Sequence, residues 1–411
     1  MQVINRWWVV IGSVFGLLVG NGPIMQFTFG IFLLPITKEF GWSRSATSLA
    51  LVTGLTMTAI CVPIAGRLID RYGIRAVTLP SIVLFALCLA SVSLFASTPE
   101  SFVAIYALMG MAAAGQTPLP YAKAISSWFD DRRGLALGIA MSGVGLGAAL
   151  VPQFAQYLVT AFSWKTAYLG LAALVLVVGS SAVLLAVQES PGSLAGGKLQ
   201  PAPGLSAAQA LRSTLFWKLA LAFFAVALAT NGAIAHVVPL LVDRGLSPKI
   251  AAGAMAFAGF ALTGGRLLAG YLLDRIHAPF VATFFVALPL AGIAILLLAH
   301  TPAHAAVAIV LIGMGLGAEV DLIAFLLSRY LGMRSFGQIY GYLFAVFMLG
   351  SGIGPYLMGL AFDKTASYDI ALTGLGAALV LACTVLLRLG AYRYPLAKSD
   401  TAHAAPQRSA A

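Results

Sequence analysis

The chain has 411 residues, of which 60% are hydrophobic and only 9% are charged, and its formal net charge is +11. Because a soluble domain carries about 25% charged residues, this composition excludes a water-soluble globular protein and predicts one embedded in a membrane. The basic surplus is distributed along the chain as expected for membrane topology, so we expect no nucleic-acid partner.

Twelve apolar stretches, each about as long as the ~20 residues that cross a bilayer as a helix, follow one another along the chain. Lipid offers an open backbone no hydrogen-bond partner, so we expect each stretch to be a transmembrane helix. They are too long and too continuously apolar for barrel strands. The predicted segments are 8–34, 46–66, 76–96, 102–127, 135–160, 166–187, 217–241, 250–272, 279–299, 305–328, 337–361 and 369–390.

The first segment, 8–34, follows Arg6 and has no small-residue cleavage site, which predicts a retained helix rather than a signal peptide. It contains Asn21-Gly22-Pro23 near its middle. Because proline cannot donate a backbone hydrogen bond, we expect the helix to open here beside a cavity.

The loop after the second segment has the sequence Gly66-Arg67-Leu68-Ile69-Asp70-Arg71-Tyr72-Gly73-Ile74-Arg75. Its glycines permit a tight turn between two helices. Asp70 is able to meet the positive N-terminus of a neighbouring helix, and Arg71 and Arg75 to bridge carboxylates. Such bonds form in one conformation and break in another, which predicts a gating role for this loop.

The second half of the chain repeats the first at a nearly constant offset. Pairs of identical residues lie 204 positions apart: Pro35 and Pro239, Gly66 and Gly270, Asp70-Arg71 and Asp274-Arg275, and Ser163 and Ser367. The second loop copy carries His277 where Gly73 predicts glycine. Two parallel six-helix repeats are typical of transporters.

The longest polar stretch separates these repeats and is rich in glycine and proline. It predicts a flexible linker at 188–214 between an N-terminal half, 1–187, and a C-terminal half, 215–393, with a flexible tail at 394–411. With both termini inside, sixteen Lys and Arg residues fall in the inner loops and tails and six in the outer loops. This asymmetry fits the positive-inside rule and an even number of spans.

The pattern Gly-x-Leu-x-Asp-Arg-x-Gly-x-Arg at 66–75 resembles the signature loop of the major facilitator superfamily. The stretch from Trp128 to Gly143, WFDDRRGLALGIAMSG, resembles a signature of the monocarboxylate transporters and is similar to the bacterial oxalate–formate antiporters. The stretches 29–32 and 39–44 resemble the bacterial members of that group. The resemblance implies an all-α membrane fold of twelve helices in two six-helix repeats.

Arg266 lies in the segment 250–272, four residues before Gly270. An ionisable residue within a membrane helix is costly and marks a functional candidate. The family resemblance implies that Arg266 binds the substrate anion, and a guanidinium grips a carboxylate with two parallel hydrogen bonds. The alternative is an arginine that snorkels to the inner face. The vertebrate relatives carry an aspartate and a lysine where Leu262 and Phe27 stand here, so proton coupling by those two residues does not transfer.

Two carboxyl groups, Glu319 and Asp321, lie within the apolar segment 305–328. Residues two apart on a helix point in nearly opposite directions, so both do not face one cavity. A carboxyl group kept from water holds its proton more firmly than in solution. We hypothesise that Glu319 or Asp321 carries a coupling proton; the alternative is a static pair with Arg329 or Lys123.

Several neutral polar residues in membrane segments predict a hydrogen-bonding lining for the substrate path. They are Asn21, Gln116, Tyr121, Asn231 and His236. For His236, a satisfied structural histidine is the competing interpretation.

The chain shows no glycine-rich lysine loop for ATP, no catalytic triad and no metal-ligand spacing, and Cys61, Cys88 and Cys383 lie apart in apolar segments. We therefore expect no cofactor and no enzyme activity, and an ion or solute gradient as the driving force.

Together the residues and the resemblance predict a secondary transporter, working as a monomer in a bacterial inner membrane with both termini cytoplasmic. It would move a small organic anion, most simply a monocarboxylate, with a proton. Alternatives are uptake or efflux of an aromatic or heterocyclic nutrient or drug, such as a riboflavin-like vitamin, and a membrane receptor that does not transport.

Overall fold

The computed structural model describes residues 5–42, 44–190, 194–195, 198–199, 202–246, 248–298 and 301–394. Within these residues the chain is helical apart from short turns, one bridge and one two-stranded hairpin. This confirms the predicted all-α class.

The first half of the chain forms one bundle of helices. Its elements are α1 (Arg6–Leu18), η1 (Gly22–Gln26), α2 (Phe29–Phe40), α3 (Arg44–Tyr72), α4 (Ile74–Phe95), α5 (Pro99–Ala113), η2 (Ala114–Gln116), α6 (Pro118–Trp128), α7 (Arg133–Ala161), α8 (Trp164–Leu174), η3 (Val175–Gly179) and α9 (Ser180–Leu185).

The second bundle follows a short connection. The connection contains β1 (Leu194–Ala195), β2 (Lys198–Leu199), which pair antiparallel, and α10 (Ala207–Arg212). The bundle consists of α11 (Thr214–Asp243), α12 (Pro248–Leu273), α13 (Ala278–Leu297), α14 (Pro302–Tyr330), α15 (Phe336–Thr365) and α16 (Asp369–Leu387).

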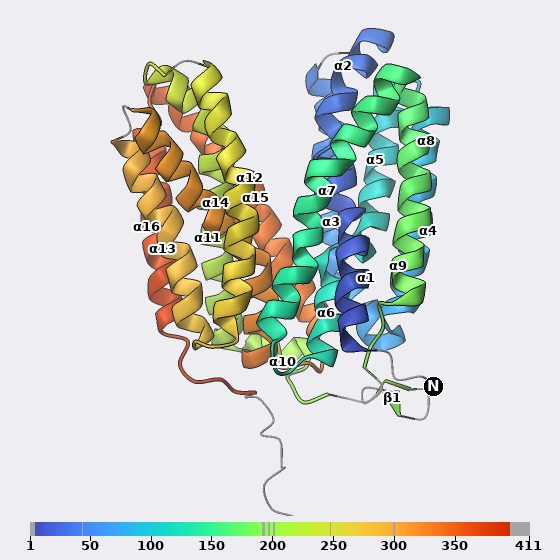
Figure 1. Ribbon diagram of the computed structural model, residues 1–411, viewed down its shortest axis with the longest axis vertical. Helices are drawn as coiled ribbons and strands as arrows, with labels where there is room; N and C mark the ends of the chain where they lie inside the picture. Colours follow the sequence, from blue (N-terminus) through green and yellow to red (C-terminus); the bar gives the residue numbers. More distant parts are fainter. Residues whose placement is uncertain are drawn as a thin grey trace, which may run out of the picture.

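The two bundles stand side by side and lie close at the end that bears the N-terminus, whereas their other ends diverge (Figure 1). The main contacts between them are α3 with α15 and α7 with α12. Glycine makes the close approach possible: a Cβ atom at Gly134 would lie 2.5 Å from the Gly270 oxygen, and one at Gly66 would lie 2.0 Å from the Gly337 oxygen. The molecule is therefore closed at the end bearing the N-terminus.

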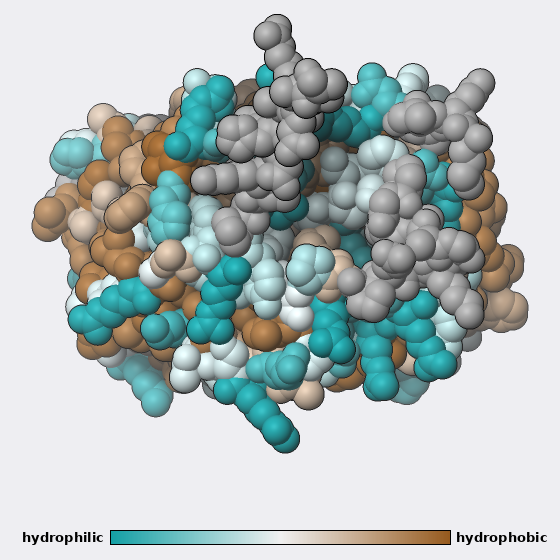
Figure 2. Space-filling model, turned by 90° about the horizontal axis from the view of Figure 1, so that it is seen from below, coloured by the Kyte–Doolittle hydropathy of each residue, from teal (hydrophilic) through white to brown (hydrophobic). Residues whose placement is uncertain are grey.

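Eleven helices among the described residues are long and apolar enough to cross a membrane, and Phe257–Leu273 within α12 is a shorter apolar helix. Figure 2 looks onto the closed end, where hydrophilic side chains gather on the face while hydrophobic ones lie along its rim. This arrangement fits a protein whose sides contact lipid and whose end contacts water. The chain is an integral membrane protein.

The first predicted segment, 8–34, is interrupted in the structure. α1 ends at Leu18, a π-helical turn spans Gly22–Gln26, and α2 begins only at Phe29. The break coincides with Asn21-Gly22-Pro23, because Pro23 has no N–H with which to continue the α-helical ladder.

Both ends of the predicted linker pack against the bundles. The Glu189 carboxylate accepts a hydrogen bond of 2.6 Å from the Ile74 N–H at the start of α4. At the other end, Leu205 N–H donates to Leu331 O and Met333 N–H to Pro203 O, both at 2.9 Å. Each helical bundle thus fixes the chain segment adjoining it.

Candidate functional site

Arg266 is buried on α12 and its guanidinium links the two bundles. Its Nη1 donates to the Met141 carbonyl of α7 at 2.5 Å, and its Nε donates to the Gly317 carbonyl of α14 at 3.0 Å. Only 5% of the residue is exposed. The guanidinium therefore does not snorkel to the inner face in this conformation.

Asp321 is the carboxylate beside Arg266. Its Oδ2 lies 3.6 Å from Arg266 Nε, which is close enough for an ion pair but too long for a hydrogen bond. Asp321 is fully buried. Lys123 and Arg329, the alternative partners considered for this carboxylate, pair instead with Asp70 and Asp130.

Glu319 lies two residues before Asp321 on the same helix and is 1% exposed. Both of its oxygens lack a hydrogen-bond partner among the described residues, as do both oxygens of Asp321 and the hydroxyl of Tyr340 on α15. The Thr230 hydroxyl of α11 lies near Glu319 and donates to the Val226 carbonyl. Buried polar atoms of this kind are costly unless a proton, water or ligand satisfies them.

Two of the neutral residues predicted for the lining make their contacts inside the first bundle. The Gln116 side chain donates to the Ser81 carbonyl of α4 at 3.1 Å. Tyr121 is 1% exposed, and its ring lies over Gly16 of α1, where a Cβ atom would clash with it. Asn21 is half-buried where η1 begins.

The other two neutral residues connect helices of the second bundle. Asn231 donates to the Ser351 hydroxyl of α15 at 3.2 Å. His236 lies 3.0 Å from the Pro355 carbonyl through Nε2 and 3.4 Å from the Tyr368 hydroxyl through Nδ1. Within the described residues, neither shares a hydrogen bond with Arg266 or Asp321.

Asp70 forms the first of two matching latches between the bundles. Its two carboxylate oxygens accept hydrogen bonds of 2.9 Å from the N–H groups of Gly337 and Gln338 at the start of α15. Lys123 Nζ lies 2.9 Å from the same carboxylate and also donates to the Ile69 carbonyl. A carboxylate at a helix N-terminus is stabilised by the helix dipole.

Asp274 forms the second latch in the repeat-related position. It accepts hydrogen bonds of 2.7 and 2.8 Å from the N–H groups of Gly134 and Leu135 at the start of α7. The residue 204 positions after Lys123 is Leu327, so the repeat does not place a lysine at the equivalent position of this copy. Burial raises the pKa of Asp274 above its ordinary value, although the two backbone donors act in the opposite direction.

The arginines of the two loops stay within their own bundles. Arg75 donates from Nε to the carbonyls of Val183 and Val187 at 3.1 and 3.0 Å. Arg71 lies over the Tyr72 ring, and Arg275 over the Tyr271 ring at 3.5 Å. In this conformation Asp70 and Asp274 bridge the bundles, whereas Arg71, Arg75 and Arg275 of the same loops do not.

A further set of contacts across the bundles was not predicted. Arg329 of α14 donates to the Asp130 carboxylate at 2.8 Å, and Arg133 of α7 donates to the Ser328 hydroxyl at 2.8 Å. In the sequence, the run Asp130–Arg133 contributes only to loop charge and to family resemblance, and Arg329 is considered as a partner of Glu319 or Asp321 rather than of Asp130. Their pairing depends on how the two bundles meet, which periodicity does not reveal.

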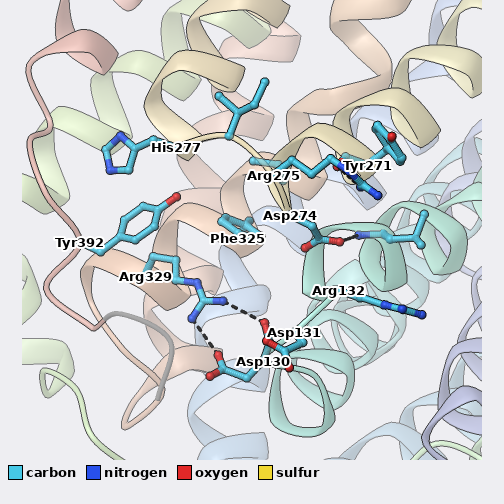
Figure 3. A pocket seen from close by; sticks show the side chains of 13 residues that line it. Asp130, Asp131, Arg132, Tyr271, Asp274, Arg275, His277, Phe325, Arg329 and Tyr392 are labelled. Atoms are coloured by element: carbon cyan, nitrogen blue, oxygen red, sulfur yellow. Dashed lines mark hydrogen bonds and ion pairs between the residues drawn. The ribbon is translucent and has the colours of Figure 1, made fainter. Parts of the chain in front are cut away.

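A cavity of about 730 Å³ lies beside the second latch (Figure 3). Its wall includes the Asp130–Arg132 loop from the first bundle and Tyr271, Asp274 and Arg329 from the second. In Figure 3 the Asp274 carboxylate points to the start of α7, while Arg329 points to Asp130.

The comparisons with known proteins agree with this architecture. The sequence profile of the Major Facilitator Superfamily matches residues 14–355. Human monocarboxylate transporter 11 is 26% identical over 378 residues, covering 88% of this chain and 78% of that protein. The oxalate:formate antiporter of Oxalobacter formigenes is 28% identical over 281 residues, covering 66% of this chain and 64% of that protein.

Solved structures show the same fold at low sequence identity. The transporter FucP in its outward conformation aligns with a TM-score of 0.74 and 16% identity, over 94% of this chain and 99% of that chain. The human organic anion transporter MFSD10 aligns with a TM-score of 0.71 and 16% identity, over 93% and 99% of the two chains.

Proposed function

The chain belongs to the Major Facilitator Superfamily, and on this basis we propose that it carries a small organic anion, in the first place a monocarboxylate, together with a proton. It does so by alternating access between the halves 1–187 and 215–393, joined by the linker 188–214. The proposed location is a bacterial inner membrane, with both termini in the cytoplasm and a monomer as the working unit. The named activities of the relatives, monocarboxylate and oxalate:formate transport, favour an anionic substrate.

The observation that carries the proposal is the buried guanidinium of Arg266 next to the unbonded carboxyl group of Asp321. A permanent positive charge within a bilayer needs a negative partner. A substrate carboxylate offers two oxygens in the plane that a guanidinium prefers, whereas Asp321 stands too far away to bond. Arg266 therefore favours an anionic ligand over its present contacts.

The count of charges supports coupling to a proton. When no substrate is present, the negative charge of Asp321 balances the positive charge of Arg266. Glu319 then has no positive charge to pair with among the described residues, so its protonated form is favoured. When a monoanion binds Arg266, Asp321 becomes the surplus charge and takes up a proton. One anion and one proton then leave the net charge of the site unchanged.

The hydrogen bond from Arg266 to Met141 connects binding to movement. It joins α12 to α7 across the two halves in the conformation closed towards the N-terminal end. A substrate carboxylate is a stronger acceptor than a neutral carbonyl, because it carries a negative charge and accepts two parallel hydrogen bonds from one guanidinium. Substrate that takes this donor weakens the closed contact and favours opening on the cytoplasmic side.

The latches made by Asp70 and Asp274 oppose that opening. Each holds the N-terminus of a helix in the other half, and each must release for the cytoplasmic ends to separate. We assign the contacts of Asp70, Asp274, Arg329 and Arg133 to this gate. Arg71 and Arg75, and Arg275 in the second copy of the loop, for which the sequence repeat predicts the same gating role, are proposed to act in the opposite conformation.

The test is uptake of radiolabelled compounds into proteoliposomes under an inward proton gradient. The panel contains lactate, pyruvate, oxalate, an aromatic acid and riboflavin. Losing a hydrogen bond to a charged group costs about 1.5–3 kcal/mol, so Arg266→Gln is expected to lower uptake of a carboxylate by about tenfold or more. Arg212→Gln, at an exposed position on α10, is the matched control and is expected to transport normally.

Uptake of riboflavin alone, with no effect of Arg266→Gln, would reject the anion proposal and favour transport of a heterocyclic nutrient. Saturable binding without counterflow would instead favour a receptor.

A further inference from the structure

An apolar groove of about 430 Å³ runs between α15 and α16, away from the residues of the proposed substrate site. α11 packs closely against both helices, while α15 and α16 touch each other little, so α11 forms the floor through Leu228. On α15 the wall is formed by Leu357, Leu360 and Lys364. Their spacing of three and four residues places them on one face of that helix.

The α16 wall is unusually open. Ile370 is 67% exposed, and a Cβ atom placed at Gly374 would meet no other atom within 4 Å. Both helices belong to membrane spans, Phe336–Thr365 and Asp369–Leu387. The groove follows the last turns of α15 and the first turns of α16, so it runs from the apolar part of these spans to their end at Lys364. In its apolar part water finds no polar partners and a hydrocarbon chain fits.

A positive charge stands at one end of the groove. Lys364 lies in the last turn of α15 and makes no ion pair with any described residue. The nearby Asp369 is bonded to Arg244 at 2.6 Å, so it does not neutralise Lys364. Asp363 precedes Lys364 in the chain but does not line the groove.

We propose that this groove binds a membrane phospholipid, with one acyl chain along α15 and the phosphate on the Lys364 ammonium. From Leu357 to Lys364 the helix rises about 10 Å, and a partner helix with side chains is about 10–12 Å across. One turn of such a helix fills roughly 400–600 Å³, so a groove of about 430 Å³ holds no more than about one turn, which favours a single hydrocarbon chain over a helix. The cation at its membrane-surface end matches a phosphate.

The experiment is native mass spectrometry of the purified full chain during titration with palmitoyl-oleoyl phosphatidylglycerol. Gly374→Phe is designed to fill the groove without a clash at its Cβ atom, and Lys364→Gln removes the phosphate contact. Gly352→Phe is the matched control, because a Cβ atom there also meets no other atom within 4 Å and Gly352 lies outside the groove.

Wild type and Gly352→Phe are expected to retain one phospholipid at the same lipid concentration. Gly374→Phe is expected to lose it, and Lys364→Gln to weaken its binding by about fivefold, the effect of one basic residue near a lipid surface. Palmitoyl-oleoyl glycerol, which lacks the phosphate, is expected to bind wild type and Lys364→Gln equally.

Equal retention of phosphatidylglycerol by wild type and Lys364→Gln would overturn the proposal, and this exposed substitution tests it even if Gly374→Phe does not fold. A dimer that Gly374→Phe converts to a monomer would overturn it in favour of an interface between two copies.

Discussion

In the function we propose, substrate binding and the opening of the two halves are coupled through Arg266, Met141 and Asp321. The guanidinium of Arg266 bonds to a carbonyl of the opposite half and lies 3.6 Å from the carboxylate of its own half. Any change in what Arg266 binds therefore changes what holds the halves together. This arrangement leads to two predictions at the scale of single residues.

Arg266→Gln is expected to favour opening of the end that bears the N-terminus even without substrate, because it removes the hydrogen bond from Arg266 to Met141, one of the contacts between α12 and α7. The measurement is the distance distribution between spin labels on the cytoplasmic ends of these two helices. Asp321→Asn is the control, since it leaves the guanidinium and its bond to Met141 in place. An unchanged distribution in Arg266→Gln would show that the bond does not lock the closed state.

Asp321→Asn is expected to abolish uptake driven by a proton gradient while preserving exchange of substrate across the membrane. The asparagine amide resembles a carboxyl group that always keeps its proton, so this variant neither takes up nor releases the coupling proton. Glu319→Gln is expected to keep gradient-driven uptake, because Glu319 has no ion pair with Arg266 among the described residues. The reverse pattern in uptake and counterflow assays would assign the proton to Glu319.

At the scale of helices, the closed end depends on contacts between glycine backbones. Gly134 of α7 and Gly270 of α12 approach so closely that a Cβ atom on either would lie 2.5–2.6 Å from the oxygen of the other. The two aspartate latches lie at the same ends, on the first residues of α7 and α15. At the end bearing the N-terminus, the two bundles are therefore held together by backbone contacts and by the two aspartate carboxylates.

Gly134→Leu is expected to hold the cytoplasmic ends apart, because its side chain occupies the space that α12 needs. Labelling of a cysteine placed beside the cytoplasmic cavity should then be faster than in the parent chain. Gly259→Leu on α12 is the control, since a Cβ atom there meets no other atom within 4 Å. Equal labelling rates in both variants would contradict the role given to this contact.

The second latch predicts an effect of cytoplasmic pH. Burial raises the pKa of Asp274 in the closed state, and contact with water in the open state returns it towards its ordinary value. The closed state then binds the proton more tightly, so acid on the cytoplasmic side favours closure and alkali favours opening. Spin-label distances should shift with pH in this direction in the parent chain and not in Asp274→Asn. A shift towards opening in acid would contradict the argument.

At the scale of the whole molecule, the sequence repeat is visible in the contacts as well as in the residues. Lys165 pairs with Glu39 at 3.0 Å in the first half, and Arg244 pairs with Asp369 at 2.6 Å in the second. Lys165 and Asp369 are 204 positions apart and Glu39 and Arg244 are 205 positions apart, so an ion pair recurs at nearly the same place in the second half with its charges exchanged. Similarly, Glu189 caps Ile74 and the Tyr392 hydroxyl caps Ala278.

Much of the fold follows from local pattern. The lengths of the apolar segments predict the membrane helices, and the constant offset between identical residues indicates two repeats. The break at Asn21-Gly22-Pro23 follows from the missing N–H of Pro23. Hydropathy predicts these helices because, in lipid, the backbone N–H and C=O groups of a membrane helix form their hydrogen bonds within that helix.

The site is less accessible to prediction, because its contacts join residues far apart in the chain. Arg266 stands out by its charge within an apolar segment, but its bond to Met141 involves a carbonyl that every residue possesses. The pairing of Arg329 with Asp130 requires the relative position of two halves. Gln116 and Tyr121 are candidates only because they are polar residues in apolar segments. Polarity does not distinguish a side chain that faces the substrate path from one that packs within its own bundle.

We propose that one anion and one proton move together through the site of Arg266 and Asp321. The most direct test compares uptake driven by a pH gradient with uptake driven by a membrane potential. Initial uptake of the transported carboxylate is measured in proteoliposomes, once with a pH gradient at zero membrane potential and once with a membrane potential at equal pH. Electroneutral coupling predicts that the pH gradient drives accumulation and that the potential alone does not. Accumulation driven by the potential, with no response to the pH gradient, would contradict the account.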